Sequence, residues 1–322
     1  MGYEQLMKGA RRILECGCVK EGEKVLILTD TAQPENIAHS LFEAAKEKGA
    51  EAVIITMEPV VPAGDLPTIV DKAMKAADLI ITPTSTSIYH SRSTKEACAA
   101  PYLSRMIALS EITEDAMMNG GVTADFASIR PMIDRLLKVY TDGNTIRYTT
   151  PAGTDLRASI ANRDGYFVSG VTDHEGMLQA LPTIEVFIAP VEESIEGTVV
   201  VDASCSGGVG LVDEPIYMDV KAGKIVSIKG GTAAKKLQEK LSSMKTPNAY
   251  QIAEYGVGLN PKCRVIGTTE DEGRYGTCHF GIGDNTGFGG VSEAPIHLDV
   301  ILWKPTIEID EKKIFRDGEC II

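Results

Sequence analysis

Residues 1–142 alternate between short apolar runs and amphipathic segments. The segments between the runs place apolar residues at helical spacing, as in residues 33–50, where Ile37 and Leu41 share one face. Each apolar run has the length and composition of a buried strand of a parallel sheet. The four runs lie at residues 24–30, 51–59, 78–85 and 105–111. This alternation predicts an α/β domain with a mostly parallel, doubly wound sheet.

The pattern changes after residue 142. Residues 145–150, 197–204 and 215–231 alternate with a period of two, which is typical of half-buried strands, and Lys221–Lys224 has the composition of a hairpin turn. One helix is expected at 232–244. We therefore predict two domains: a Rossmann-like α/β domain over residues 1–142, and an α+β domain over residues 143–322.

Composition narrows the classes of function. The chain has 322 residues, 43% of them hydrophobic, and a net charge of −13, which disfavours nucleic-acid and anionic-membrane partners. No apolar run is long enough for a membrane span, and seven cysteines without metal-finger spacing indicate reduced thiols in a cytoplasmic protein. The first predicted strand is not followed by a glycine-rich turn, so a dinucleotide cofactor is not expected.

Two of the five histidines, His279 and His297, fall between residues 276 and 302. His297 and Asp299 are two positions apart in a strand-like run, so their side chains point to the same face. An imidazole and a carboxylate placed in this way can hold a divalent ion such as zinc, iron, cobalt or manganese, and His279 can add a second nitrogen. The alternative is a half-buried histidine that the aspartate orients through a hydrogen bond.

Two further acids lie in apolar surroundings. Glu185 interrupts the strand pattern of residues 181–190, and Glu254 precedes an apolar, glycine-containing segment. Buried carboxylates normally pair with a cation or bind a metal, because burial without a partner costs several kcal/mol. His90 follows a predicted strand at its carboxyl end, where α/β sheets bind ligands, and is a candidate catalytic residue or else an exposed loop histidine.

Four segments carry a family resemblance: "PTIEVFIAP", "AEYGVGLNP", "GTCHFGIG" and "IHLD". They resemble, in the same order, motifs of the M29 aminopeptidases, the aminopeptidase T or thermophilic metallopeptidase family. The resemblance implies an N-terminal α/β domain, a C-terminal metal domain and a homodimer. It also implies a two-metal site for zinc, cobalt or manganese on Glu185, Glu254, His279, His297 and Asp299.

The sequence departs from the peptidases at one position. Thr286 stands where those enzymes resemble one another in having a tyrosine, which removes a hydrogen-bond donor to a developing oxyanion. The wider superfamily includes the 2,5-dihydroxypyridine dioxygenases, whose two-histidine, one-carboxylate iron(II) site His279, His297 and Asp299 would supply.

Three hypotheses follow. The first is a leucyl aminopeptidase-like hydrolase that cleaves a peptide or amide bond in a short peptide or small molecule with a metal-activated water. The second is a mononuclear non-haem iron(II) dioxygenase that opens a hydroxylated heteroaromatic ring. The third is a non-catalytic metal-binding relative of these enzymes.

Overall fold

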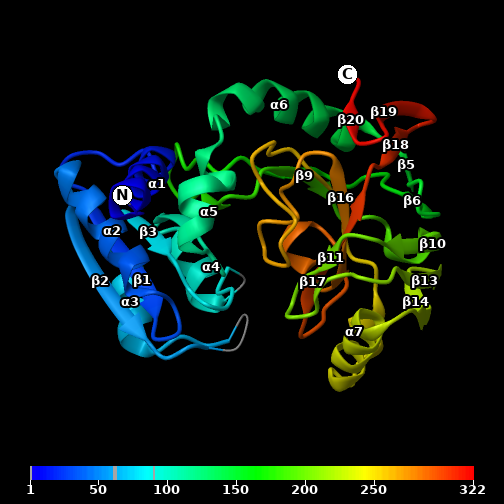
Figure 1. Ribbon diagram of the computed structural model, residues 1–322, viewed down its shortest axis with the longest axis horizontal. Helices are drawn as coiled ribbons and strands as arrows, with labels where there is room; N and C mark the ends of the chain where they lie inside the picture. The colour runs from blue at the N-terminus through cyan, green and yellow to red at the C-terminus, as the bar shows by residue number, and fades with distance from the viewer. Residues whose placement is uncertain (1, 61–63, 90) are drawn as a thin grey trace. The chain divides into compact units, whose positions relative to one another are not determined.

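The computed structural model describes residues 2–60, 64–89 and 91–322 (Figure 1). Contacts between Cα atoms divide the chain into two compact units. The first contains the chain up to Phe126 together with Val168–Pro182, and the second contains Ala127–Phe167 and Thr183–Ile322. The domain boundary expected between residues 142 and 143 stays a prediction.

A five-stranded parallel sheet forms the first unit, in the order β2-β1-β3-β4-β8. Four of its strands lie where the apolar runs predict them, so the mixed α/β class with a parallel sheet is confirmed. The fifth strand, β8, comes from the part of the chain that the sequence analysis assigned to the second domain. It is only three residues long, which is too short for a strand pattern to be recognised in the sequence. The strands are β1 (Lys24–Asp30), β2 (Glu51–Met57), β3 (Leu79–Thr82), β4 (Arg105–Ala108) and β8 (Leu178–Ala180).

The strand β2 differs from the expectation of burial on both faces. It pairs only with β1 at the edge of the sheet, and Val53 is 51% exposed. A continuous apolar run does not distinguish an edge strand from a central one, because the run does not reveal how many neighbours the strand has.

Helices cover the parallel sheet. Leu26 and Leu28 of β1 pack with Val70 and Met74 of α3, and Gly17 after α1 lies against Leu79 of β3. An ion pair of 2.6 Å between Arg105 and Glu23 is largely buried in this unit. The helices are α1 (Gly2–Cys16), α2 (Glu35–Glu47), α3 (Thr68–Met74), α4 (Arg92–Cys98) and α5 (Glu114–Asn119), followed by the 3-10 turn η1 (Gly121–Thr123). No described helix combines the length and apolar composition that a membrane crossing requires.

The second unit contains two antiparallel sheets and the helices α6 (Phe126–Asp142) and α7 (Thr232–Ser243). The eight-stranded sheet has the order β14-β13-β10-β6-β5-β18-β19-β20. Its predicted hairpin is confirmed, since Lys221 pairs with Lys224. Its strands are β5 (Thr145–Thr149), β6 (Asp155–Ser159), β10 (Glu196–Val201), β13 (Ile216–Lys221), β14 (Lys224–Lys229), β18 (Thr306–Ile309), β19 (Lys312–Arg316) and β20 (Glu319–Cys320).

The seven-stranded sheet has the order β12-β11-β17-β16-β15-β9-β7 and carries the candidate metal ligands. Three 3-10 turns, η2 (Glu192–Ser194), η3 (Pro247–Tyr250) and η4 (Thr286–Phe288), lie in its connections. Its strands are β7 (Gly165–Val168), β9 (Glu185–Ile188), β11 (Ser204–Cys205), β12 (Gly210–Leu211), β15 (Tyr255–Gly258), β16 (Thr277–Gly283) and β17 (His297–Trp303).

A buried aromatic cluster joins the two antiparallel sheets. The rings of Tyr148, Tyr255 and Phe280 lie 4.9–5.4 Å apart between centroids, and the hydroxyl of Tyr148 is 2.6 Å from that of Tyr140 on α6. Tyr148 comes from β5, whereas Tyr255 and Phe280 come from β15 and β16. The cluster therefore fixes the two strands that flank the candidate site against the rest of the unit.

We expect Phe280→Ala to lower the free energy of unfolding by about 3–5 kcal/mol, because it leaves a cavity among buried rings. Urea denaturation followed by circular dichroism measures the change. Tyr217→Ala is the control, since Tyr217 is 49% exposed and its loss should cost no more than about 0.5 kcal/mol. Equal effects of the two substitutions would contradict the role of the cluster.

Candidate metal centre

The five predicted metal ligands meet in the second unit. Glu185 begins β9, Glu254 immediately precedes β15, His279 lies within β16, and His297 and Asp299 lie at the start of β17. These strands are neighbours in the order β17-β16-β15-β9. The antiparallel pairing thus brings together residues that are as much as 114 positions apart in the chain.

Glycines lie opposite four of the candidate ligands in the sheet. His279 pairs with Gly256 and Glu185 with Gly258, while Asp299 pairs with Gly281 and His297 with Gly283. The first two glycines alternate along β15 and the last two along β16, so each pair shares one face of its strand.

The missing side chains at two of these glycines leave room for the candidate ligands. A Cβ on Gly256 would overlap the imidazole of His279, and a Cβ on Gly281 would lie 2.7 Å from both Glu254 and His297. Gly256 and Gly281 are needed because only a bare backbone lets the ligands approach the sheet so closely.

Glu254 is shared between two groups of candidate ligands. The Nε2 atom of His279 lies 3.2 Å from a carboxylate oxygen of Glu185 and 3.2 Å from one of Glu254. The Nε2 atom of His297 lies 3.4 Å from the other oxygen of Glu254 and 3.5 Å from Asp299. In each group, the atoms that would bind a metal lie within 4.8 Å of one another.

The carboxylates are buried without enough hydrogen-bond donors. Glu185, Glu254, His279 and Asp299 are each no more than 8% exposed. Among the residues that the structure describes, no hydrogen bond of acceptable geometry reaches Glu185 Oε2, Asp299 Oδ1 or His279 Nδ1. One imidazole Nε2 carries at most one proton, so His279 cannot satisfy both glutamates, whereas a cation between them can.

The backbone determines which nitrogen of His297 faces the carboxylates. Its Nδ1 atom lies 2.7 Å from the carbonyl oxygen of Asp284, which can only accept, so Nδ1 donates. Nε2 therefore points toward Glu254 and Asp299. A hydrogen bond from the outer nitrogen to a backbone carbonyl is the usual arrangement behind a metal-binding histidine.

The acid–base properties of the site reflect the same shortage of positive charge. Burial lowers the pKa of His279, but the contacts with Glu185 and Glu254 outweigh burial and raise the pKa well above its usual value. His297 has a raised pKa because Asp299 and Glu254 likewise outweigh burial. Burial raises the pKa of Glu185. These groups together, two imidazoles and three carboxylates, fit a divalent metal ion.

A sixth residue, Glu272, adjoins the group and was not found in the sequence analysis. Its Oε1 accepts a hydrogen bond of 3.3 Å from Thr183, and burial together with the charges of Asp299 and Glu185 raises its pKa well above the usual value. Glu272 lies in the segment "TEDEG", where three adjacent acids resemble an exposed loop. No feature of that segment signals a carboxyl group beside Asp299.

Two other sequence predictions have different outcomes. The candidate catalytic residue His90 lies outside the described residues. Thr286 is exposed in η4, and its hydroxyl donates to Asp284 at 3.0 Å. It is absent from both groups of candidate ligands.

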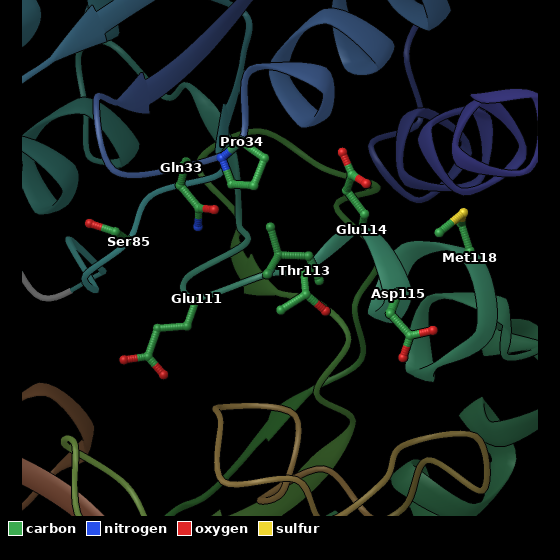
Figure 2. A pocket seen from close by; sticks show the side chains of 9 residues that line it. Gln33, Pro34, Ser85, Glu111, Thr113, Glu114, Asp115 and Met118 are labelled. Atoms are coloured by element: carbon green, nitrogen blue, oxygen red, sulfur yellow. The ribbon is translucent and has the colours of Figure 1, made fainter. Parts of the chain in front are cut away.

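The first unit contains a cavity of its own, of about 740 Å³ (Figure 2). It lies beyond the carboxyl ends of β1, β3 and β4, where α/β sheets commonly bind ligands. Its lining includes Gln33, Ser85, Glu111, Thr113 and Asp115. None of its lining residues belongs to the group around Glu254.

The fold and the site define a class of protein: an α/β unit joined to a β-rich unit that places histidines and carboxylates on one sheet. The sequence matches the family described as 2,5-dihydroxypyridine 5,6-dioxygenase over residues 5–322. The chain belongs to this family.

Individual relatives agree with the family. The 2,5-dihydroxypyridine 5,6-dioxygenase of Pseudomonas putida is 24% identical over an alignment of 351 residues, which covers 98% of this chain and 96% of the relative. A solved 2,5-dihydroxypyridine dioxygenase from the same species has a TM-score of 0.84 at 20% identity, covering 99% of this chain and 97% of that one. AmpT from Thermus thermophilus has a TM-score of 0.70 at 14% identity and covers 99% of both chains.

These findings correct the leading hypothesis. The prediction of an aminopeptidase-like hydrolase is wrong, because the family match over nearly the whole chain is to a dioxygenase. AmpT shares the fold of this chain, and the four segments that carry the resemblance contribute the strands β9, β15, β16 and β17 of that fold. The second hypothesis, a ring-opening dioxygenase, agrees with the family.

We expect the metal-free protein to become less stable as pH rises above about 6.5. A histidine whose pKa is raised in the folded state stabilises the protein fully below its unfolded pKa of about 6.5, and this stabilisation is lost as pH rises through the folded pKa. Thermal melting after chelation, from about pH 6.5 to 9, measures the decline, and His297→Gln should reduce it. The exposed His174→Gln is the control. A melting temperature that does not fall over this range would contradict the account.

Proposed function

We propose that the protein is a mononuclear non-haem iron(II) dioxygenase that opens the ring of a hydroxylated pyridine of the 2,5-dihydroxypyridine type. The observation that carries the proposal is the convergence of two imidazole Nε2 atoms on buried carboxylates in a chain of this family. Two histidines and one carboxylate are the usual ligands of iron(II) in oxygenases that leave positions open for reactants.

We assign His279, His297 and Asp299 as the iron ligands. Both imidazoles direct Nε2 at the same residue, Glu254, at 3.2 and 3.4 Å from its two carboxylate oxygens, and Asp299 lies 3.5 Å from Nε2 of His297. Iron(II) held there supplies one-electron chemistry with dioxygen, which amino-acid side chains lack.

The remaining carboxylates have separate roles in this proposal. Glu254 lies against both imidazoles and compensates their charge. Glu185 is buried with a raised pKa and accepts the proton of a ring hydroxyl, because a carboxylate with an elevated pKa is suited to proton transfer near neutral pH.

Aromatic side chains lie next to His297. The ring of Phe288 meets that imidazole edge to face at 5.8 Å, and Phe288 in turn contacts Phe187 and Tyr166 at 5.3 and 6.3 Å. Aromatic faces and edges bind other rings at such distances. This cluster therefore supports a heteroaromatic substrate over a peptide.

We expect the iron(II)-loaded protein to consume dioxygen when 2,5-dihydroxypyridine is added, and His297→Ala to reduce the rate to background. An oxygen electrode measures the rate, and the product is followed by loss of the ring absorbance. His174→Ala should behave as the wild type, since His174 is exposed and lies outside the site. Uptake that survives His297→Ala would contradict the assignment of His297.

We also expect discrimination among substrates. 2-Hydroxypyridine, which lacks the second hydroxyl, should give no more than about 1% of the rate, because a site built to bind a hydroxyl rejects an analogue without it. Equal rates with the two pyridines would show that the second hydroxyl is not recognised.

A further inference from the structure

The segment between β16 and β17 makes two contacts with His297. The carbonyl oxygen of Asp284 accepts from Nδ1 at 2.7 Å, and Phe288 meets the ring edge to face. Both contacts come from residues 284–292, which we call the His297 loop. The orientation of the imidazole therefore depends on the position of this loop.

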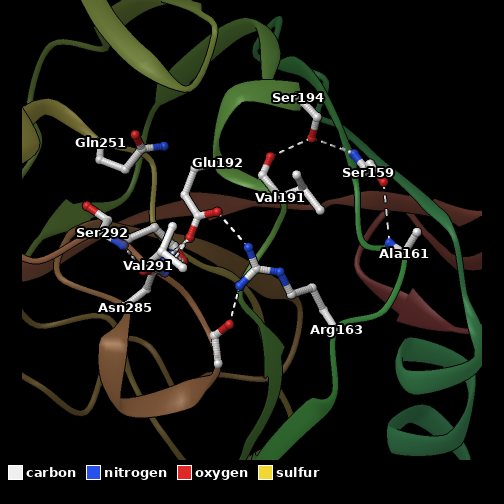
Figure 3. A network of polar contacts seen from close by, with 12 residues as sticks. Ser159, Ala161, Arg163, Val191, Glu192, Ser194, Gln251, Asn285, Val291 and Ser292 are labelled. Carbon is white, nitrogen blue, oxygen red and sulfur yellow. Dashed lines mark hydrogen bonds and ion pairs between the residues drawn. The ribbon is translucent and has the colours of Figure 1, made fainter.

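Glu192 of η2 holds the His297 loop at two points (Figure 3). Its Oε1 accepts from the side-chain amide of Asn285 at 3.0 Å and from the backbone N–H of Val291 at 2.7 Å. Its Oε2 accepts from Arg163 at 2.6 Å. Arg163 also donates to the carbonyl oxygen of Gly289, which adds a third attachment to the loop.

The attachments extend to Ala253, the residue before the candidate ligand Glu254. The Asn285 amide also donates to the carbonyl oxygen of Ala253 at 3.1 Å, and its own oxygen accepts from the backbone N–H of Ser292 at 2.8 Å. Asn285 is fully buried, and a Cβ on Gly290 would overlap its carboxamide. The loop is thus closed around Asn285 and joined to the segment beside Glu254.

The buried negative charge of Glu192 is the centre of this network. Glu192 is 8% exposed, so its carboxylate requires partners, and Arg163 with two N–H donors supplies them. Hydrogen bonds to a carboxylate are stronger than those between neutral groups. One buried carboxylate therefore fixes both ends of the His297 loop.

We propose that Arg163 and Glu192 are positioning residues that hold the His297 loop so that the carbonyl oxygen of Asp284 accepts a hydrogen bond from Nδ1 and Nε2 is presented to the metal. This inference takes only the identity of the metal, iron(II), from the proposed function. Neither residue contacts the candidate ligands directly in this role. Both act through Asp284 and Phe288.

Two measurements on Glu192→Gln test the proposal. The glutamine keeps the size of the side chain but places a neutral amide, in place of the carboxylate, against Arg163. We expect the dissociation constant for iron(II), measured anaerobically, to rise about 10- to 100-fold, as is usual when the partner behind a metal-binding histidine is lost. We expect the His297 Nδ1–H proton of the chelated, ¹⁵N-histidine-labelled protein to exchange with water at least about tenfold faster, since it loses its fixed acceptor.

The matched control is Glu23→Gln. Glu23 also pairs with an arginine at 2.6 Å in largely buried surroundings, but it lies in the first unit. The Glu23→Gln substitution should lower the melting temperature without changing the iron affinity or the exchange of the His297 Nδ1–H proton. Arg163→Met provides a second variant with the same expected changes if Glu192→Gln does not fold.

The outcomes separate this proposal from the proposed function. Faster Nδ1–H exchange in the Glu192 or Arg163 variant alone supports the positioning role, even if the wild type binds no iron. Unchanged exchange and unchanged iron affinity in a folded variant overturn it, even if the wild type is an active dioxygenase. Equal changes in Glu23→Gln would also overturn it, because they would reflect a general loss of stability.

Discussion

The structure depends on placing buried carboxylates around two imidazoles. Glu185, Glu254 and Asp299 bring negative charge into a region where water cannot solvate it, and such burial is unfavourable without a cation. Protons on His279 and His297 supply that charge in the metal-free state, which is why their pKa values are raised. A divalent ion held by these residues would replace those protons and would satisfy several oxygens at once.

Close approach to the sheet is the second requirement. Gly256 of β15 and Gly281 of β16 give the ligands a bare backbone to lie against, and the aromatic cluster of Tyr148, Tyr255 and Phe280 packs these strands against β5. The His297 loop then completes the site through Asp284, while Glu192 and Arg163 hold the loop. Rigid strands carry the ligands, and a buried ion pair fixes the connection between them.

Much of this arrangement is predictable from the sequence. Continuous apolar runs and helical spacing locate β1, β3 and β4, and the out-of-place acids Glu185 and Glu254 do converge with His279 and His297. Other features depend on tertiary pairing and have no local signal. These features are the edge position of β2, the short strand β8, the placement of the Glu272 carboxyl group and the hydrogen bond from Val291 to Glu192. The four segments that carry the family resemblance form strands of a fold that AmpT and a dioxygenase share, so they indicate the fold and do not decide the reaction class.

The central claim is that one iron(II) ion lies between His279 and His297. Anaerobic titration with iron(II), followed by elemental analysis and X-ray absorption at the iron edge, tests it most directly. The account predicts one ion per chain, with two nitrogen ligands in the wild type and one in His279→Gln. Two ions per chain, or an iron environment that His279→Gln leaves unchanged, would contradict it.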